Sequence, residues 1–238
     1  MKEVKESGGE VAAFFDLDGT LVAGPSLEQR FFRMLRWRGG IPVKNYFLWS
    51  REAVRLARRG MRAIRYLNKM YLRGVAIRTV DRQAAETSFF AAGVDRVAWH
   101  AKQGHKIVIV SGTLEMLARK AAMQLEAELG ARGPVAKIHV CATRLEEREG
   151  KWTGHVIGMA MCGEAKAEAV RRMAEKEGLD LTKCCAYGDS AMDRWMLAAV
   201  GWPVTVNPSK KLLRFAQQRK WPTQLWGKRR EEESTQSL

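Results

Sequence analysis

Two aspartates separated by one residue follow an apolar stretch, in the run Phe14-Phe15-Asp16-Leu17-Asp18-Gly19-Thr20. In an extended backbone, residues two apart point to the same side, and the glycine lets the chain turn sharply after them. A carboxylate on a strand end can attack phosphorus once a cation neutralises the charge between them. The second carboxylate can protonate the leaving oxygen and then activate water. The run therefore has the parts of a nucleophile with its acid/base partner.

A simpler interpretation is that Asp16 and Asp18 lie in a solvated turn or cap a helix. The preceding run Val11–Phe15 is apolar and predicts a buried strand. Charges at the end of a buried strand are costly unless they are paired or used. The position of the pair therefore favours a functional role over a solvated turn.

Polar residues also follow two further predicted strands. Lys106–Val110 leads into Ser111, and Lys183–Tyr187 leads into Gly188-Asp189. Helical patterns separate the strands, at 114–129, 164–177 and 192–199, and 204–206 is a weaker fourth strand. Alternating strands and helices predict an α/β fold, a doubly wound, Rossmann-like parallel sheet. Such sheets bind ligands beyond the carboxyl ends of their strands, so these polar ends should meet at one crevice.

The stretch 24–87 interrupts the alternation. It contains no convincing strand and predicts three or four helices separated by glycines, which indicates an inserted helical cap over the crevice. A β-hairpin is expected within 142–158, turning near Glu149-Gly150. We therefore predict a core of 11–23 with 88–226, a helical cap of 24–87, and disordered tails at 1–10 and 227–238.

The run Asp16-Leu-Asp-Gly-Thr-Leu-Val22 resembles the first signature of the haloacid dehalogenase-like phosphohydrolase superfamily. The later signatures of that superfamily are matched in order by Ser111-Gly112, by Lys166 in Gly163-Glu-Ala-Lys, and by Gly188-Asp189-Ser-Ala-Met-Asp193. The resemblance implies a magnesium-dependent phosphomonoester hydrolase that forms an aspartyl-phosphate.

The resemblance also implies a role for each matched residue. Asp16 would be the nucleophile and Asp18 the general acid/base, while Ser111, Gly112 and Lys166 would bind the phosphoryl group. Lys166 would also neutralise the charge of the nucleophile. Mg²⁺ would be held by Asp16, the main-chain carbonyl of Asp18, Asp189 and Asp193. Three alternatives stay open at this point: Ser111 as a helix N-cap, Lys166 as a surface lysine, and a phosphotransferase use of the intermediate.

A helical insert directly after the first signature is similar to the branch that includes phosphoserine phosphatase. Three positions depart from that enzyme's pattern. Pro25 stands where it carries a glutamate that holds the substrate amine, Thr113 where it commonly has a second glycine, and Met192 where it has an asparagine. The branch therefore predicts the fold and the reaction, and the departures disfavour phosphoserine as the substrate.

The chain carries a net charge of +15, and most of it lies in the cap. Residues 24–93 include 15 Lys and Arg against 4 Asp and Glu, a net of +11. On a helical projection one basic face is predicted, made of Arg51, Arg55, Arg58, Arg59, Arg62, Arg65, Lys69 and Arg73. Aromatics precede it, at 31, 32, 37, 46, 47 and 49.

This charge predicts an anionic partner, either a phosphorylated small-molecule or amphiphilic substrate or an anionic membrane surface. A basic module that binds nucleic acid or membrane on a phosphatase-like scaffold is the alternative. Nucleic-acid binding would explain the charge but not the four signatures. The sequence leaves the oligomeric state open.

The remaining signals are structural. The four cysteines show no C-x-x-C spacing and are expected to be reduced core thiols, and the four histidines have no ligand spacing. No uncharged run reaches the roughly 18 residues needed to span a bilayer. We therefore expect a cytoplasmic protein, with peripheral membrane contact as an option.

Overall fold

The strands of the central sheet run parallel in the order β3-β2-β1-β6-β7-β8, in a computed structural model that describes residues 10–80, 87–131 and 137–227. The strands are β1 (Ala12–Phe15), β2 (Lys106–Leu114), β3 (Ile138–Thr143), β6 (Cys185–Gly188), β7 (Trp202–Val206) and β8 (Thr223–Gln224). β1 is central, with Ala13 paired to Ile107 on one side and to Cys185 on the other. The predicted doubly wound α/β fold is confirmed.

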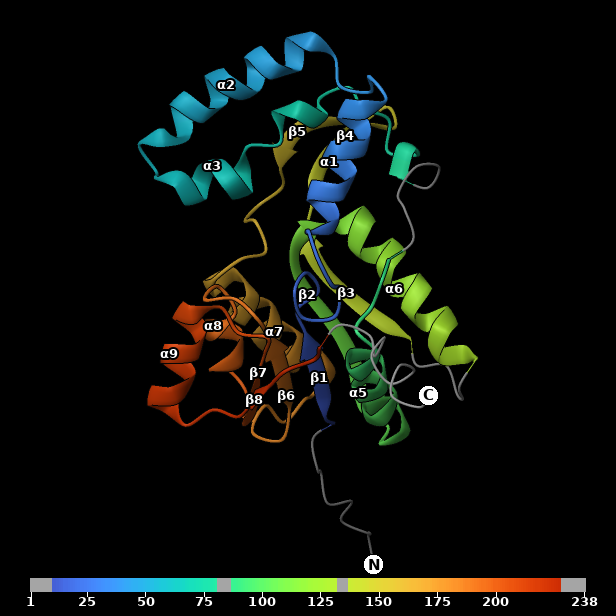
Figure 1. Ribbon diagram of the computed structural model, residues 1–238, viewed down its shortest axis with the longest axis vertical. Helices are drawn as coiled ribbons and strands as arrows, with labels where there is room; N and C mark the ends of the chain where they lie inside the picture. Colours follow the sequence, from blue (N-terminus) through green and yellow to red (C-terminus); the bar gives the residue numbers. More distant parts are fainter. Residues whose placement is uncertain (1–9, 81–86, 132–136, 228–238) are drawn as a thin grey trace, which may run out of the picture.

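Alternate residues of β1 face opposite layers of the core. Ala13 and Phe15 pack in one cluster with α5 (Ala91–Lys102) and α6 (Glu115–Gly130). Ala12 and Phe14 pack in a second cluster with α7 (Glu164–Glu177), α8 (Arg194–Leu197) and α9 (Lys210–Arg219). Figure 1 shows these two helical layers on either side of the sheet. A strand covered on both faces is apolar throughout, which is why Val11–Phe15 has no alternation.

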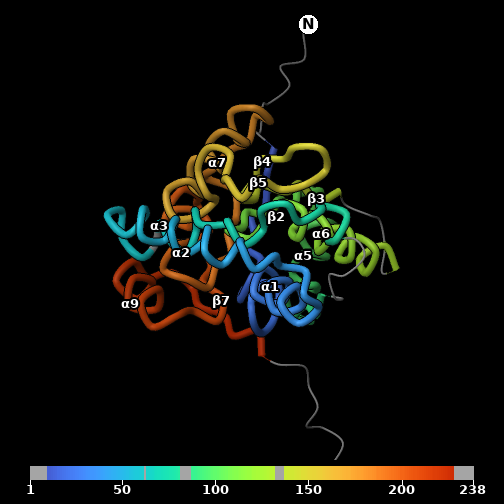
Figure 2. Tube along the Cα trace, turned by 90° about the horizontal axis from the view of Figure 1, so that it is seen from above, coloured from blue at the N-terminus to red at the C-terminus, as the bar shows by residue number. Residues whose placement is uncertain are grey.

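A group of helices lies beyond the carboxyl ends of the strands (Figures 1 and 2). It consists of α1 (Leu27–Trp37), α2 (Val43–Ala57), α3 (Met61–Leu67) and the short 3₁₀ helix η1 (Met70–Leu72). These elements occupy the stretch for which a helical insert is predicted. We propose residues 24–87 as a cap domain over a core of 11–23 and 88–226.

The hairpin of β4 (Leu145–Arg148) and β5 (Lys151–Val156) turns at Glu149 and Gly150, which both have positive φ, at 52° and 71°. That geometry belongs to the tight hairpin turn predicted there. The hairpin packs against the cap, because the N–H of Gly74 donates to the Trp152 carbonyl at 2.7 Å. The Trp152 ring also meets Phe31 edge to face.

The single basic face predicted across Arg51 to Arg73 does not form, and this prediction is wrong. The stretch forms two helices, because α2 ends at Ala57 and α3 begins at Met61 after Gly60, whose φ is 86°. α3 ends at Leu67 before the extended Asn68, so the residues of the predicted face share no single helical phase. Lys69 is 3% exposed and paired with Glu28, while Arg65 lines an internal cavity. The side chain of Arg62 lies outside the described residues.

Smaller predictions concern the cysteines, the outer strands of the sheet and the two tails. The four cysteines, all within the described residues, form no disulfide, and Cys184 is buried whereas the other three are half-buried. Strands β3 and β8 were not predicted. Of the tails predicted at 1–10 and 227–238, only Glu10 and Gly227 lie within the described residues, and Glu10 bridges to Leu179 beside the sheet. Within the described residues, no helix has the length and apolar character to cross a membrane.

Candidate active site

Asp16 follows the last residue of β1, and its N–H donates to the Tyr187 carbonyl of β6 at 2.9 Å, which fixes its backbone in the sheet. Its carboxylate is buried and accepts a hydrogen bond from Lys166 Nζ at 2.5 Å. The same Nζ lies 2.5 Å from Asp193 Oδ1. Lys166 lies in the first turn of α7 and is 3% exposed, so its interpretation as a surface lysine is wrong.

Three carboxylates converge around this lysine. Asp16, Asp189 and Asp193 each place an oxygen within 4.8 Å of the others. Asp189 follows β6, and Asp193 stands at the start of α8, where its Oδ2 accepts from the N–H and the hydroxyl of Ser190 at 2.9 and 2.7 Å. The carboxyl ends of two adjacent strands and the starts of two helices thus supply one cluster.

The electrostatics of the cluster show an excess of negative charge. Burial is the largest influence on Asp16 and raises its pKa to about 7 against the opposing effect of Lys166. Burial, together with the charges of Asp16 and Asp193, raises the pKa of Asp189 to about 9. Burial alone would lower the pKa of Lys166, but its two carboxylate partners raise it instead. One ammonium does not balance two buried carboxylates and the half-buried carboxylate of Asp189.

A magnesium ion fits this donor set. Mg²⁺ prefers a small number of carboxylate oxygens, completed by waters and phosphate oxygens. Asp189 offers a carboxylate oxygen, and Oδ2 of Asp16 accepts only a 3.3 Å hydrogen bond from Thr20. Both oxygens of Asp193, in contrast, accept hydrogen bonds of 2.5 to 2.9 Å from Lys166 and Ser190. Asp193 therefore fits better as the residue that positions Lys166 than as a direct ligand.

Asp18 and Ser111 lie at the same cavity as Asp16. Asp18 Oδ1 accepts the N–H of Leu27, the first residue of α1, at 2.8 Å, and burial raises the pKa of its carboxyl group. Ser111 lies in β2 and is 1% exposed, and its hydroxyl accepts from Thr113 N–H. The N-cap of α6 is Leu114, so the interpretation of Ser111 as a helix cap is wrong.

Gly19 is required by the close approach of two loops. Its φ is +90°, and a Cβ placed on it would lie 2.4 Å from Asp189 Oδ2. A side chain would therefore displace the carboxylate that follows β6. Because Gly19 has no side chain, the segment that carries Asp16 and Asp18 can approach the segment that carries Asp189.

The cavity above the cluster has a volume of about 780 Å³ and is lined by both the core and the cap. Asp16, Asp18, Ser111, Gly112, Lys166 and Asp189 all line it. The structure thus brings the sequence-predicted site residues to one cavity, with Asp193 fully buried just behind it.

A family model described as haloacid dehalogenase-like hydrolase matches residues 13–198. The chain belongs to this family. The match spans β1 to α8 and includes every segment of the acidic cluster.

Relatives of the chain carry phosphatase names. A probable phosphatase of Mycobacterium tuberculosis is 37% identical over 137 residues, which cover 56% of this chain and 42% of that protein. A phosphoserine phosphatase of the same organism is 28% identical over 230 residues, covering 88% of this chain and 69% of its own. The inhibition of morphological differentiation protein of Streptomyces azureus is 32% identical, covering 89% and 76%. The chain thus spans less than half of the first of these relatives.

Solved structures share the fold. A protein of unknown function from Bordetella pertussis Tohama I has a TM-score of 0.68 at 26% identity, covering 90% of this chain and 98% of that one. A phospho-aspartyl intermediate analogue of phosphoserine phosphatase has a TM-score of 0.60 at 20% identity, covering 92% and 95%. The predicted membership of the haloacid dehalogenase-like hydrolases is confirmed by the family model, and the predicted likeness to the phosphoserine phosphatase branch is confirmed for the fold.

Sequence reasoning missed a polar cluster in the cap, made of Glu28, Lys69 and Tyr71. Glu28 Oε1 accepts from the Lys69 ammonium and from the Tyr71 hydroxyl, the latter at 2.7 Å. Burial and the Glu28 charge raise the pKa of Tyr71. Glu28 lies on α1 and Lys69 beside η1, 41 residues apart, so no local pattern pairs them. The carboxylate of Glu28 forms an ion pair with Lys69, so Glu28 is not an unpaired acid in the cavity.

The sequence departs from the pattern of phosphoserine phosphatases at three residues that all line the cavity, Pro25, Thr113 and Met192. The Thr113 hydroxyl is buried and has no hydrogen-bond partner among the described residues. A buried hydroxyl without a partner at a cavity wall is available to a ligand.

Proposed function

We propose that this chain is a magnesium-dependent phosphomonoester hydrolase that acts through an aspartyl-phosphate on Asp16. The observation that carries the proposal is the convergence of Asp16, Lys166, Asp189 and Asp193 at one cavity that also presents Asp18 and Ser111. A structural salt bridge would not need two additional acids beside it. Phosphoryl transfer needs this combination of an anionic nucleophile, a cation site and positive charge.

In the first step, an Asp16 carboxylate oxygen attacks phosphorus and the bond from phosphorus to the ester oxygen breaks. Asp18 donates its proton to the departing alkoxide, which leaves as an alcohol. Lys166 holds Asp16 in place through the 2.5 Å contact and offsets charge on the phosphoryl oxygens. The Ser111 hydroxyl and the Gly112 N–H are in the cavity wall to donate to a phosphoryl oxygen.

In the second step, Asp18 accepts a proton from water, and the oxygen of that water attacks phosphorus. The bond between phosphorus and Asp16 breaks, which releases inorganic phosphate, restores the Asp16 carboxylate and leaves Asp18 protonated for the next cycle. Because Asp18 supplies the base that water needs, hydrolysis of the aspartyl-phosphate is favoured over transfer of the phosphoryl group to another acceptor. Magnesium, held by Asp16, Asp189 and the main-chain carbonyl of Asp18, would supply charge neutralisation between nucleophile and phosphate.

The nucleophile is tested with Asp16→Asn. We expect the magnesium-dependent hydrolysis of a simple aryl phosphate to fall by about 10³-fold or more, because an amide cannot form the acyl phosphate. Asp180→Asn, at a half-buried aspartate that does not line the cavity, is the matched control and should retain activity. Activity retained in Asp16→Asn would refute the mechanism.

The cap side of the cavity indicates the substrate class. Phe32, Tyr46, Trp49 and Tyr66 provide aromatic surface there, and Arg33, Arg36 and Arg65 also line it. Among the described residues Arg33 and Arg36 have no carboxylate partner. A cavity of about 780 Å³ exceeds the needs of a phosphoryl group on a short chain. The proposed substrate is a small-metabolite or amphiphilic phosphomonoester with an apolar part and a second anionic group.

A substrate comparison tests this class. Two phosphomonoesters of equal length, one ending in an anionic group and one in a hydroxyl, should differ by about tenfold in kcat/KM in favour of the anion, because charge-assisted hydrogen bonds add affinity. Arg33→Gln with Arg36→Gln should remove the difference, and Arg78→Gln, an exposed cap arginine outside the cavity, should not. Equal kcat/KM values for both substrates in the wild type would exclude recognition of a second anionic group on the substrate.

A further inference from the structure

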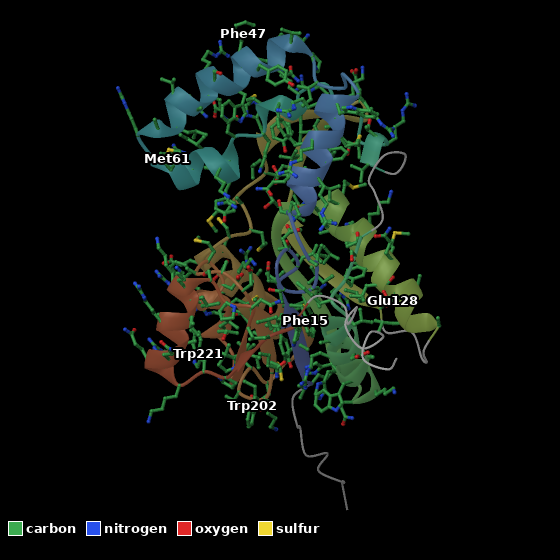
Figure 3. All side chains as sticks on the ribbon, in the orientation of Figure 1. Phe15, Phe47, Met61, Glu128, Trp202 and Trp221 are labelled. Carbon is green, nitrogen blue, oxygen red and sulfur yellow. The ribbon has the colours of Figure 1, made fainter. Side chains whose placement is uncertain are left out.

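The outer face of α2 carries an exposed apolar ridge. Val43, Phe47 and Val54 are 73%, 72% and 76% exposed, and their spacing places them within about 40° of each other on a helix of 3.6 residues per turn. The buried residues of α2, Asn45 and Leu56, lie on the opposite side. Figure 3 shows Phe47 on the side of α2 that faces away from the core. Water-exposed apolar side chains in one line indicate a contact surface.

The ridge is part of a wider concentration of exposed apolar groups. Trp37, at the end of α1, and Met61, at the start of α3, are 86% and 78% exposed. Of the thirteen exposed large apolar side chains among the described residues, seven lie between 37 and 61. The exposure is therefore a property of this part of the cap and not of the whole surface.

A basic row runs beside the ridge. Lys44, Arg51, Arg55 and Arg58 are exposed and fall about 60–120° around the helix from Val43. Between 36 and 65 the sequence has nine Lys and Arg and a single acid, Glu52, which pairs with Arg55 at 2.6 Å. The row therefore presents uncompensated positive charge along one flank of an apolar ridge.

We infer that this face of α2 docks on an anionic lipid bilayer. A helix with an apolar face and a basic flank is the pattern that lies in the bilayer interface, with its apolar side chains at the acyl boundary and its cations at the lipid phosphates. A second copy of the chain is a poorer occupant, because it would set the same basic row against itself. The cavity-lining residues Tyr46 and Trp49 lie on other sides of the helix, so docking leaves the cavity uncovered.

The test is co-sedimentation of the full chain with two kinds of vesicle, phosphatidylcholine alone and equal parts phosphatidylcholine and phosphatidylglycerol. At low ionic strength we expect binding to the anionic vesicles only, weakened by added salt. Phe47→Ser with Val54→Ser should weaken it about tenfold or more, and so should Arg51→Glu with Arg58→Glu. Hydrolysis of a soluble aryl phosphate should stay unchanged in both double variants, which reports that they fold.

Matched controls separate this face from general charge and exposure. Met123→Ser removes an exposed apolar side chain on α6, and Lys210→Glu with Lys211→Glu makes the same charge change on α9. Both should bind the anionic vesicles like the wild type. Failure of the wild type to bind would overturn the inference, as would equal weakening by the α9 variant. Self-association of the chain without lipid binding, seen by sedimentation velocity, would overturn it in favour of a dimer.

Discussion

A lysine in the first turn of a helix carries no functional signal in the sequence. The role of Lys166 comes from the two carboxylates that surround its ammonium group. Its ammonium is buried between Asp16 and Asp193 at 2.5 Å from each, so it holds the nucleophile in one rotamer. Asp193 in turn is held by the N–H and hydroxyl of Ser190. The nucleophile is thus positioned by a chain of polar contacts rather than by packing alone.

Gly19 gives a prediction at the same scale. Gly19→Ala should lower phosphatase activity by about 10²-fold, because the new Cβ forces the Asp189 carboxylate from its position and small displacements of reacting groups are costly. It should also cost about 1–2 kcal/mol of unfolding free energy from the positive φ. Activity and urea denaturation measure the two effects.

Gly104→Ala is the control for that change. Gly104 also has a positive φ, at 73°, but no atom lies within 4 Å of its added Cβ. It should show a similar loss of stability with unchanged activity. A similar loss of activity in both variants would attribute the effect to backbone strain instead of the contact with Asp189.

At the scale of elements, α1 is tied to the segment around η1 through Glu28. Its carboxylate pairs with Lys69, which is buried and also donates to the Arg65 carbonyl. Asn45 of α2 adds a second tie, donating to the carbonyls of Tyr71 and Arg73 at 3.1 and 2.7 Å. These polar contacts hold three helical segments of the cap around the cavity.

The pair between Glu28 and Lys69 predicts that Glu28→Gln destabilises the protein by about 2–4 kcal/mol, because it leaves a buried ammonium without a counter-charge. Glu52→Gln breaks the pair with Arg55, whose side chain is 68% exposed, and should cost about 0–1 kcal/mol. Urea denaturation of both variants measures the difference. Equal costs would show that the buried pair does not stabilise the cap.

At the scale of the whole molecule, a hydrogen-bonded chain crosses the core on the α5 side of the sheet. His100 lies 2.8 Å from His105 through their Nδ1 atoms and 2.9 Å from the Tyr187 hydroxyl through Nε2. Burial lowers the pKa of His100 to about 3, and the charges of His105 and Arg96 act in the same direction. Burial also lowers the pKa of His105. Among the described residues, the group of side chains that could hold a metal ion does not include these histidines.

The hydrogen-bonded chain of His105, His100 and Tyr187 predicts that the folded state loses stability in acid. Since His100 is neutral when folded, the unfolded chain binds more protons below about pH 6.5, and stability falls as pH falls from there towards about pH 3. His100→Gln should reduce that slope by up to about 1.4 kcal/mol per pH unit. His155→Gln, an exposed histidine in β5, should leave it unchanged. Urea denaturation at several pH values gives the slopes, and identical slopes in wild type and His100→Gln would contradict the prediction.

The sequence by itself determined the parts of the molecule that local pattern controls. Apolar runs and the polar residues after them located β1, β2 and β6, the helices α6 and α7 were predicted to within a residue, and the tight turn at Glu149-Gly150 required its own residue types. Asp16, Asp18 and Asp189 were found for the same reason, because they follow apolar runs that are visible locally, whereas Asp193 was found from the resemblance to the family's last signature.

Tertiary structure alone decided which charges are buried together. Lys166 lies 150 residues from Asp16, and Lys69 lies 41 residues from Glu28, distances over which no helical or strand period carries information. The predicted basic face failed because breaks at Gly60 and after Leu67 interrupt the helical phase. What remained of it on α2 is a shorter basic row beside an apolar ridge that only the packing of the cap left exposed.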